Sequence, residues 1–352
     1  GTSTSKTTEV TMYKVLTLRV GFDERRHGYV NPMQELINDV EHKFNSAEDR
    51  NTYKPLPFYP TNPYDPHASV CNIVIQKDVN GIDQMFTEDR SESFHDNTIV
   101  EFRYDQSREP GWRWIPIKVR HDKTDEFKKG GKNFGNAYHV AESNWKSIHN
   151  PITESMLKTG EDIPMETPDY NVYYNRKTSK SNTKPLRDFH NLVVKRNLII
   201  GASKRGDTLI DLAVGKAGDL PKWIASKLDF VFGIDISRDN IENRLDGACA
   251  RYLNMKKRTK IMPSALFVNG NSGVNIRNTE AMFSEQSKRI TNAVFGEGPK
   301  DEGALGKAVY KQYGKGKKGF NIASCQFAVH YFFESPTTLR EFLRNVTECL
   351  AV

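Results

Sequence analysis

Apolar and polar residues alternate along four segments in the first third of the chain, which is the pattern of half-buried β-strands. These segments are residues 14–20, 68–75, 98–104 and 112–120. Proline-rich and acidic turns separate them, and a helical periodicity lies between them at roughly residues 32–44. Several strands with one interposed helix are typical of a small barrel of the oligonucleotide-binding (OB) type. We therefore predict an OB-fold β-barrel domain over residues 8–135.

From residue 136 onward the spacing of the apolar residues becomes helical. Trp145, Ile148, Ile152 and Met156 follow one another at intervals of three or four positions. Residues 160–185 are polar and carry three prolines. Residues 136–184 are accordingly predicted to form a helical segment and a linker.

Short apolar runs alternate with longer amphipathic segments in the rest of the chain. The runs are residues 208–212, 229–235, 265–268 and 320–325, and a helix is predicted over 337–350. This alternation is typical of a parallel sheet with crossover helices. About forty glycine-rich residues between the last two runs are interpreted as a partly helical insertion with a mobile basic end. Residues 185–352 are thus predicted to form an α/β domain.

Composition limits the class of protein. A hydrophobic content of 37% with 27% charged residues fits a folded globular chain, and no apolar run approaches the ~20 residues that span a bilayer. No secretory signal is recognisable. Cys71, Cys249, Cys325 and Cys349 lack metal-ligand spacing, which predicts reduced thiols and no metal site. The start at Gly1 resembles the edge of a fragment.

The charge balance favours an anionic partner. The chain has 51 Lys and Arg against 44 Asp and Glu, a formal net charge of +7, and its pI is about 9.0. Nucleic acid and nucleotide phosphates are the anions that such a balance suits.

The strongest local signal for a ligand is a glycine loop that directly follows an apolar run. The segment 211–219 reads Asp-Leu-Ala-Val-Gly-Lys-Ala-Gly-Asp, and Asp235 ends the next run twenty positions after Gly215. Glycines let backbone approach a ligand, and an acid at the second strand end can bind both ribose hydroxyls. The loop has neither the Lys-Ser/Thr of a phosphate-binding P-loop nor the three glycines of dinucleotide binders. A nucleoside without phosphates, such as S-adenosylmethionine, suits it better, and a simple tight turn is the alternative.

Three ordered motifs resemble the mRNA cap guanine-N7 methyltransferases of eukaryotes and viruses. Residues 211–223 are similar to the family's D-L-x-C/A-G-K-G-G-D-L-x-K-W, and residues 321–335 to its Q-F-x-x-H-Y-x-F-E-S segment. Residues 186–199 resemble its R-x-F-N-N-W-x-K helix. The resemblance covers roughly residues 173–350. It implies a Rossmann-like S-adenosylmethionine-dependent methyltransferase fold, in this chain apparently without its last three strands.

The resemblance also implies roles for single residues. The cofactor residues that it implies are Lys195, Asp211, Gly215, Asp235, Asn271 and Gln326. Asn271 stands where the family has Asp, and an amide oxygen can accept the same hydrogen bond from the adenine amine.

Asn191, His330 and Tyr331 are implied to face the cap guanine. The structural alternatives are a core histidine for His330, core positions for Tyr331 and Phe332, and a solvated lysine for Lys195. One extra residue separates Asn191 from Lys195 compared with the family. Guanine N7 already carries a lone pair, so the implied mechanism rests on proximity and alignment, without a metal and without a catalytic base.

The end of the first domain resembles the OB-fold domain of mRNA capping guanylyltransferases. The family motif W-x-x-x-R-x-R-x-D-K corresponds to residues 112–123, in which Lys118, Arg120, Asp122 and Lys123 are implied to contact the nucleotide triphosphate. A solvated strand edge is the alternative. The lysine nucleophile motif K-x-D-G is absent, since the segment from Lys77 to Gly81 lacks its spacing.

Together these features predict an mRNA (guanine-N7) methyltransferase within a multifunctional capping enzyme of a large DNA virus. The implied partners are GpppN-capped RNA, upstream guanylyltransferase and triphosphatase domains, and a stimulatory subunit. The implied location is the host cytoplasm, in the viral factory, or the virion. The alternative functions are a guanylyltransferase and a guanylyltransferase-associated RNA-binding scaffold without catalysis of its own.

Overall fold

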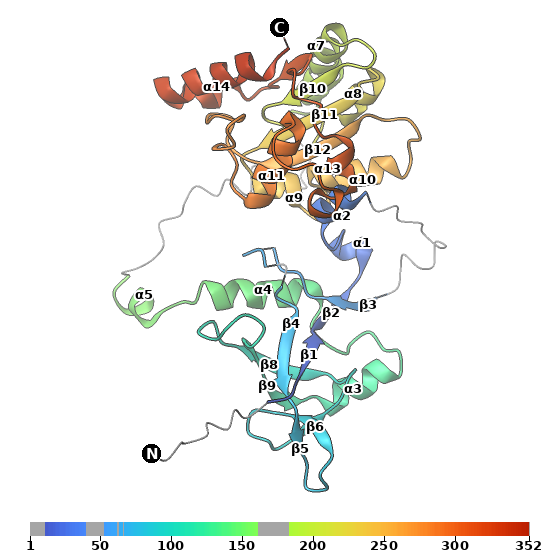
Figure 1. The fold of residues 1–352 in the computed structure, drawn as a ribbon, viewed down its shortest axis with the longest axis vertical. Coiled ribbons are helices and arrows are strands. Elements are labelled where there is room, and N and C mark those ends of the chain that lie inside the picture. The colour runs from blue at the N-terminus through green and yellow to red at the C-terminus, as the bar shows by residue number, and fades with distance from the viewer. Residues whose placement is uncertain (1–10, 40–52, 62, 66, 161–182, 352) are drawn as a thin grey trace, which may run out of the picture. The chain divides into compact units, whose positions relative to one another are not determined.

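The computed structural model describes residues 11–39, 53–61, 63–65, 67–160 and 183–351 (Figure 1). The chain divides into two compact units. One comprises residues 1–27 and 44–163, and the other comprises residues 28–43 and 164–352.

The first unit is built mainly of antiparallel β-structure. Its strands are β1 (Tyr13–Thr17), β2 (Arg19–Phe22), β3 (Lys54–Pro57), β4 (Val70–Val74), β5 (Gln76–Lys77), β6 (Asp83–Phe86), β7 (Ser93–Phe94), β8 (Val100–Tyr104) and β9 (Trp114–Val119). β1 pairs with β4, β2 with β3, β8 with β9, and β5, β6 and β7 form a three-stranded sheet. All four predicted segments contain strands. The strands of two to four residues at β3, β5, β6 and β7 are too short for alternation to indicate them.

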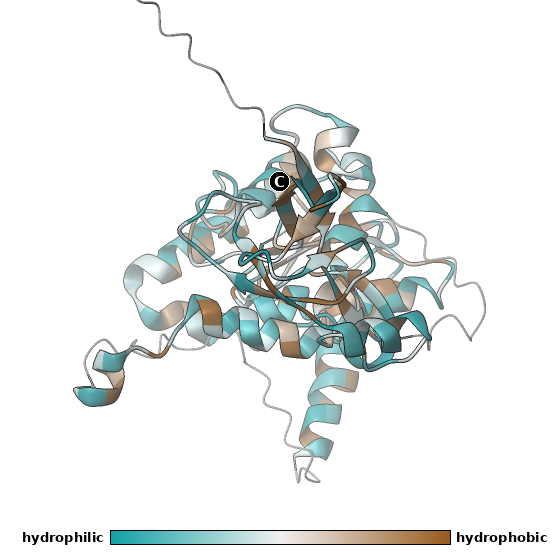
Figure 2. Cartoon of the chain, turned by 90° about the horizontal axis from the view of Figure 1, so that it is seen from below, coloured by the Kyte–Doolittle hydropathy of each residue, from teal (hydrophilic) through white to brown (hydrophobic). Residues whose placement is uncertain are grey.

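The helices of the first unit are α1 (Glu24–His27), α3 (His121–Lys128), α4 (Tyr138–His149) and α5 (Glu154–Lys158). Trp145 of α4 is 1% exposed, and its ring lies 5.9 Å from that of Phe58 and 4.9 Å from that of Tyr104. α4 and α5 lie within the predicted helical segment, separated by the non-helical residues 150–153, and α4 contributes to the core of this unit. The helices of the chain alternate between hydrophilic and hydrophobic stretches (Figure 2), as expected of helices with one buried face.

The second unit is organised around a four-stranded parallel sheet in the order β12-β11-β10-β13. Its strands are β10 (Thr208–Asp211), β11 (Phe230–Asp235), β12 (Ser264–Asn269) and β13 (Ile322–Ser324). All four lie where the apolar runs predicted them. β11 is buried along its whole length, as expected of a strand covered on both faces.

Helices surround this sheet. They are α2 (Pro32–Asn38), α6 (Lys184–Asp188), the π-helix η2 (Phe189–Val194), α7 (Lys195–Ala202), α8 (Leu220–Ala225), α9 (Arg238–Glu242), α10 (Ala248–Lys256), α11 (Glu285–Phe295), α12 (Glu302–Leu305), α13 (Lys307–Lys311), the 3₁₀-helix η3 (Val329–Glu334) and α14 (Pro336–Cys349). The helix predicted over residues 337–350 corresponds to α14.

The structure places the helix predicted within the OB barrel in a different unit. α2 packs among α10 and α13 of the second unit (Figure 1). Its apolar residues Met33, Leu36 and Ile37 belong to the core of that unit. Asp39 just after it pairs with Lys256 and Lys311. Apolar spacing identifies a helix but does not say which core its apolar face covers.

The predicted insertion between β12 and β13 is also partly corrected. α11 buries Ile290, Val294 and Phe295 in the core, so it is a crossover helix on the path from β12 to β13, which are the two edge strands of the sheet. The many glycines that follow α11 are typical of irregular structure. They therefore indicated a single irregular insertion between β12 and β13 and concealed the helix.

Candidate active site

Four polar residues stand at the carboxyl ends of the four parallel strands. Asp211 ends β10, Asp235 ends β11, Asn269 ends β12 and Ser324 ends β13. Asp211 is in register with Gly233 and Ser324 on its two neighbours. β10 lies between β11 and β13, so the strand order reverses beside it. Ligands of open α/β sheets bind at this point, outside the carboxyl ends of the strands.

The glycine loop is fixed to the end of the second strand. The N–H of Gly215 donates to Asp235 Oδ2 at 2.8 Å, and Gly215 takes a positive φ of 54°. The other oxygen of Asp235 accepts from the N–H of Ser237 at 2.9 Å and from Asn240 Nδ2 at 3.0 Å. The loop and the acid implied to bind ribose therefore form one hydrogen-bonded unit, with Asp235 8% exposed.

Asp211 is a buried carboxyl beside a second carboxyl. It is 2% exposed and accepts a hydrogen bond from the N–H of Ala213 at 3.2 Å. Burial, and after it the charge of Asp219, raises the pKa of Asp211 to about 7, while Lys195 acts in the opposite direction. Burial likewise raises the pKa of Asp235, against the hydrogen bonds that it accepts. A cationic ligand at this edge would favour the ionised carboxylates.

Two lysines converge on Asp219. Lys195 Nζ lies 3.3 Å from Asp219 Oδ2, and Lys222 Nζ lies 2.8 Å from Asp219 Oδ1. Lys222 is 5% exposed and also donates to Asn191 Oδ1 at 2.6 Å. The structure therefore brings Lys195 and Asn191 together through Asp219 and Lys222. Neither Asp219 nor Lys222 is among the predicted site residues, although both lie inside the motif 211–223.

The extra residue between Asn191 and Lys195 lies within a π-helix. η2 covers Phe189–Val194, and the N–H of Lys195 donates to the carbonyl of His190, five residues earlier. A π-bulge accommodates one additional residue in a helix without changing the face on either side of it. Asn191 and Lys195 thus both reach the same ion-pair network despite the altered spacing.

Asn271 and Gln326 have local hydrogen bonds. Asn271 Oδ1 accepts from the N–H of Gly273 at 2.8 Å. Gln326 Nε2 donates to Ser324 Oγ at 3.4 Å, which places it beside the end of β13. Each carbonyl oxygen has a second lone pair for a ligand.

The cap motif has both exposed and buried members. His330 and Tyr331 of η3 are exposed, with ring centroids 4.0 Å apart. Phe332 is buried and stacks on Phe342. The core alternatives for His330 and Tyr331 are therefore wrong.

Phe327 was missed as a site residue. It is 51% exposed, takes a positive φ of 59°, and its ring lies 4.8 Å from His190 and 5.6 Å from Lys195 Nζ. An aromatic side chain at such a strained backbone position beside the lysine makes Phe327 a candidate site residue. Phe327 lies inside the motif 321–335, but nothing in the sequence indicates its backbone conformation.

The four residues implied to bind triphosphate lie around the end of β9 in the first unit. Arg120 donates to Glu101 at 2.7 Å and to Asp122 at 3.1 Å, and these hydrogen bonds raise the pKa of its guanidinium. Lys123 donates to the carbonyl of Asn133 at 3.0 Å. Lys118 is exposed and in register with Glu101. Acids of the same unit thus hold Arg120, whereas Lys118 projects into solvent.

Within the described parts of the chain, no group of His, Cys, Asp and Glu has the arrangement of a metal site. None of the helices described is long and apolar enough to cross a membrane. The four cysteines are free thiols, and burial raises the pKa of Cys325 to about 12.

Comparison with known proteins gives relatives for both units. A probable mRNA-capping enzyme of Acanthamoeba polyphaga mimivirus is 29% identical over 304 residues, covering 79% of this chain and 24% of that protein. The mRNA cap guanine-N(7) methyltransferases of Candida glabrata and Saccharomyces cerevisiae are each 30% identical over 188 residues. These matches cover 51% of this chain and 36% and 35% of the two proteins, so the chain spans well under half the length of its relatives.

The family itself is shown by a profile match. The profile of the mRNA (guanine-N(7))-methyltransferase domain matches residues 166–352, which is more than half of the chain. Its start precedes the motif helix α6–α7, and its range contains the glycine loop and all nine residues implied to bind the cofactor or the cap. The chain belongs to the mRNA (guanine-N(7))-methyltransferase family.

Proposed function

We propose that this protein transfers a methyl group from S-adenosylmethionine to guanine N7 of GpppN-capped RNA. The observation that carries the proposal is the buried pair Asp211 and Asp235 around the glycine loop, with Lys195 beside them. A zwitterionic, sulfonium-bearing nucleoside matches this set. Its ribose suits Asp235, its cationic groups suit Asp211 and its carboxylate suits Lys195.

The other residues proposed to contact the cofactor lie just after the carboxyl ends of the strands. Asn271 lies after β12, where its amide oxygen suits an adenine amine, and Gln326 follows β13. Gly215 provides backbone close to the ligand. The cofactor supplies an electrophilic methyl group on sulfur, and the protein residues supply its orientation.

The cap side of the site is aromatic. Exposed rings at Phe327, His330 and Tyr331 offer surfaces on which a guanine base can stack. Asn191 follows His190, whose ring lies 4.8 Å from that of Phe327. Lys222 donates to the amide oxygen of Asn191. Guanine N7 attacks the methyl carbon in line, the carbon–sulfur bond breaks with its electron pair on sulfur, and no proton leaves N7. Alignment and a suitable field are then sufficient, and no general base is required.

The test is transfer of radiolabelled methyl from S-adenosylmethionine to GpppG-RNA by the purified protein. Asp211→Ala and His330→Ala are expected to abolish transfer, whereas Lys288→Ala on the surface of α11 is expected to retain it. Normal cofactor binding by calorimetry without any methylation of GpppG-RNA would contradict the proposal. Absence of cofactor binding would instead favour the scaffold function, and label transfer from GTP to the protein would indicate a guanylyltransferase.

For the first unit we propose an OB-type domain that contacts the nucleotide or RNA within a viral capping enzyme. The antiparallel pairing of its strands and the exposed Lys118 support this proposal. Lys118→Ala should weaken binding of capped RNA but not of S-adenosylmethionine. Unchanged RNA binding would contradict this role. Upstream guanylyltransferase and triphosphatase domains, a stimulatory subunit, and a location in the viral factory or virion belong to the same proposal.

A further inference from the structure

The amino ends of the four parallel strands form a second edge of the sheet, opposite the candidate active site. The segments that precede the strands are residues 203–207, 226–229, 257–263 and 312–321. Hydrogen bonds connect them to one another. Gly206 N–H donates to the carbonyl of Lys227 at 3.0 Å, and Asp229 N–H donates to that of Asp207 at 2.9 Å.

The other two segments join the same edge. Ser264 N–H donates to the carbonyl of Asp229 at 3.0 Å, and Thr208 N–H donates to Asn321 Oδ1 at 2.8 Å. The four segments therefore lie side by side at one edge of the sheet, which we call the amino edge.

The amino edge is strongly basic. It carries Lys204, Arg205, Lys227, Lys257, Arg258, Lys260, Lys315, Lys317 and Lys318 against Asp207 and Asp229. Its net charge of +7 equals that of the whole chain. The loops at the carboxyl ends, residues 212–219, 236–247, 270–284 and 325–335, hold four Lys and Arg against six Asp and Glu. The positive charge of the chain is thus concentrated on the edge away from the cap site.

Seven of these nine cations have no acidic partner among the residues that the structure describes. Lys315 pairs with Asp229, and Lys257 lies over the ring of Tyr29. Within the described residues, Arg258, Lys260, Lys317 and Lys318 are exposed and form no ion pair. The same holds for Lys204, Arg205 and Lys227. Clustered unpaired cations repel one another, and a bound polyanion relieves that repulsion.

We propose that the amino edge binds the phosphate backbone of the RNA whose cap occupies the opposite edge. This inference rests on the proposed function, which supplies the polyanion and holds its 5′ end nearby. β11 has six residues, so at roughly 3.3 Å per residue about 20 Å separates the two edges. A cap dinucleotide therefore cannot reach the amino edge, whereas a longer RNA can.

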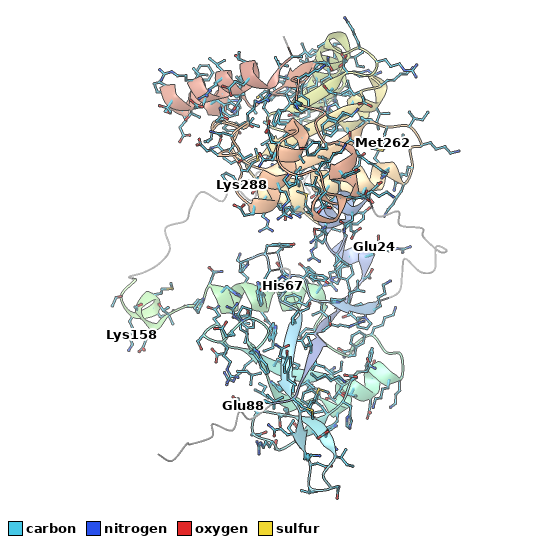
Figure 3. The ribbon with its side chains drawn as sticks, viewed as in Figure 1. Glu24, His67, Glu88, Lys158, Met262 and Lys288 are labelled. Carbon is cyan, nitrogen blue, oxygen red and sulfur yellow. The ribbon has the colours of Figure 1, made fainter. Side chains whose placement is uncertain are left out.

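The experiment compares GpppG with a capped single-stranded RNA of about 20 nucleotides, long enough to fill a typical single-strand site. The test variant combines Lys260→Glu and Lys318→Glu, from two different segments of the edge. The matched control combines Lys288→Glu and Lys307→Glu, at the starts of α11 and α13. Figure 3 labels Met262, beside Lys260 in the chain, and Lys288 on α11.

The double variant is expected to have a KM for the long RNA about tenfold higher than the parent protein. The slope of log affinity against log salt concentration should fall in magnitude by about 1.4, which is the value for two lost single-strand phosphate contacts. Its kcat and KM for GpppG and its thermal melt should equal those of the parent protein and of the control. Equal KM values for the long RNA in the parent and the double variant would overturn the proposal and leave the edge as a surface for an acidic protein. An equal loss in the control variant would also overturn it.

Fluorescence anisotropy with uncapped RNA separates this inference from the proposed function. If the parent protein failed to methylate GpppG, the proposed function would fail, but a salt-sensitive loss of RNA binding confined to the Lys260→Glu, Lys318→Glu variant would still support the amino edge.

Discussion

Ala217 illustrates how one residue limits the geometry of the glycine loop. It takes a φ of 54° and is 3% exposed, at a position where the resembled motif has glycine. Alanine tolerates the left-handed region at moderate cost, whereas a β-branched side chain there is a genuine outlier. The loop conformation thus depends on a small side chain at this position.

Ala217→Val is therefore expected to lower the free energy of unfolding of the second unit by about 2–3 kcal/mol and to raise the Kd for S-adenosylmethionine. Ala217→Gly is the matched control and should change stability by less than about 1 kcal/mol. Chemical denaturation and calorimetric titration measure the two effects. Equal stability of the valine and glycine variants would contradict the strain argument.

Asp211 couples cofactor binding to pH-dependent stability. Burial and Asp219 raise its pKa from 3.8 to about 7, so between about pH 4 and pH 7 the folded state holds a proton that the unfolded state has released. Stability conferred by this group therefore falls as pH rises through that window and is constant above it. The difference between the two pKa values corresponds to a loss of up to about 4 kcal/mol in the free energy of unfolding.

Asp211→Asn should accordingly stabilise the second unit more at pH 8 than near pH 5, while it weakens cofactor binding at both. Asn keeps the oxygen that accepts from Ala213 and carries no charge to bury. Melting curves at the two pH values measure the difference. A variant less stable than the parent at pH 8 would contradict the raised pKa, because it would show that the native unit favours the ionised carboxylate of Asp211.

At the scale of elements, α14 holds the loop that follows β12. Asn345 is fully buried, and its Nδ2 donates to the carbonyls of Ser272 at 2.8 Å and Val274 at 2.7 Å. Its Oδ1 accepts from the N–H of Ile276 at 2.9 Å. Asn271, implied to face adenine, begins this loop. The helix therefore sets the path of a cofactor loop far from it in sequence.

Asn345→Ala leaves three buried backbone groups without partners and should destabilise the second unit by about 3 kcal/mol or more. Its KM for S-adenosylmethionine should rise more than its kcat falls. Arg340→Ala on the exposed face of α14 is the control. Unchanged stability of Asn345→Ala would contradict the proposed anchoring.

α2 links an early part of the chain to the second unit. Gly28 before it has a φ of 74°, and a Cβ there would lie 2.2 Å from the carbonyl oxygen of Arg244. The N–H of Tyr29 donates to that same carbonyl at 3.0 Å. Residue 28 must therefore be glycine for two reasons: a larger side chain would clash with Arg244, and the positive φ is unfavourable for other residues.

Gly28→Ala should therefore displace the start of α2 and destabilise the second unit by about 2 kcal/mol or more. The same substitution at Gly81, where nothing lies within 4 Å of the added carbon, measures the cost of the positive φ without the clash. Thermal denaturation compares the loss of stability in the two variants. An equal loss in both variants would show that the contact with Arg244 contributes nothing.

At the scale of the whole molecule, the two units have separate hydrophobic cores. Two cores permit two cooperative transitions. Only the second unit carries the residues implied to bind S-adenosylmethionine, and a ligand stabilises only the unit that it binds. Trp112, Trp114 and Trp145 lie in the first unit, and of the 4 tryptophans only Trp223 lies in the second.

Calorimetry should therefore resolve two unfolding transitions, one for each unit. S-adenosylmethionine at 100 times its Kd should stabilise the second unit by about 2.7 kcal/mol. Tryptophan fluorescence should report mainly the transition of the first unit, which the ligand does not shift. Because α2 belongs to the second unit, Leu36→Ala should lower only the ligand-sensitive transition. A single transition that the ligand shifts as a whole would contradict the independence of the units.

The sequence by itself determined the elements and motifs whose cause is local. Apolar runs place all four strands of the parallel sheet, because strands buried on both faces are continuous apolar segments. The loop from Asp211 to Asp219 and the acid at Asp235 were identified from their order and spacing, because parallel strands bring their carboxyl ends to one edge.

Only the tertiary structure decided which core each element covers and which side chains meet. Periodicity could not assign α2 to the second unit, and glycine content concealed α11, because both depend on partners remote in sequence. The network of Asn191, Lys222, Asp219 and Lys195 forms because the π-helix and the glycine loop pack together. The basic amino edge likewise exists only once four separate loops are joined by the sheet, since a linear sequence shows their charges as unrelated surface residues.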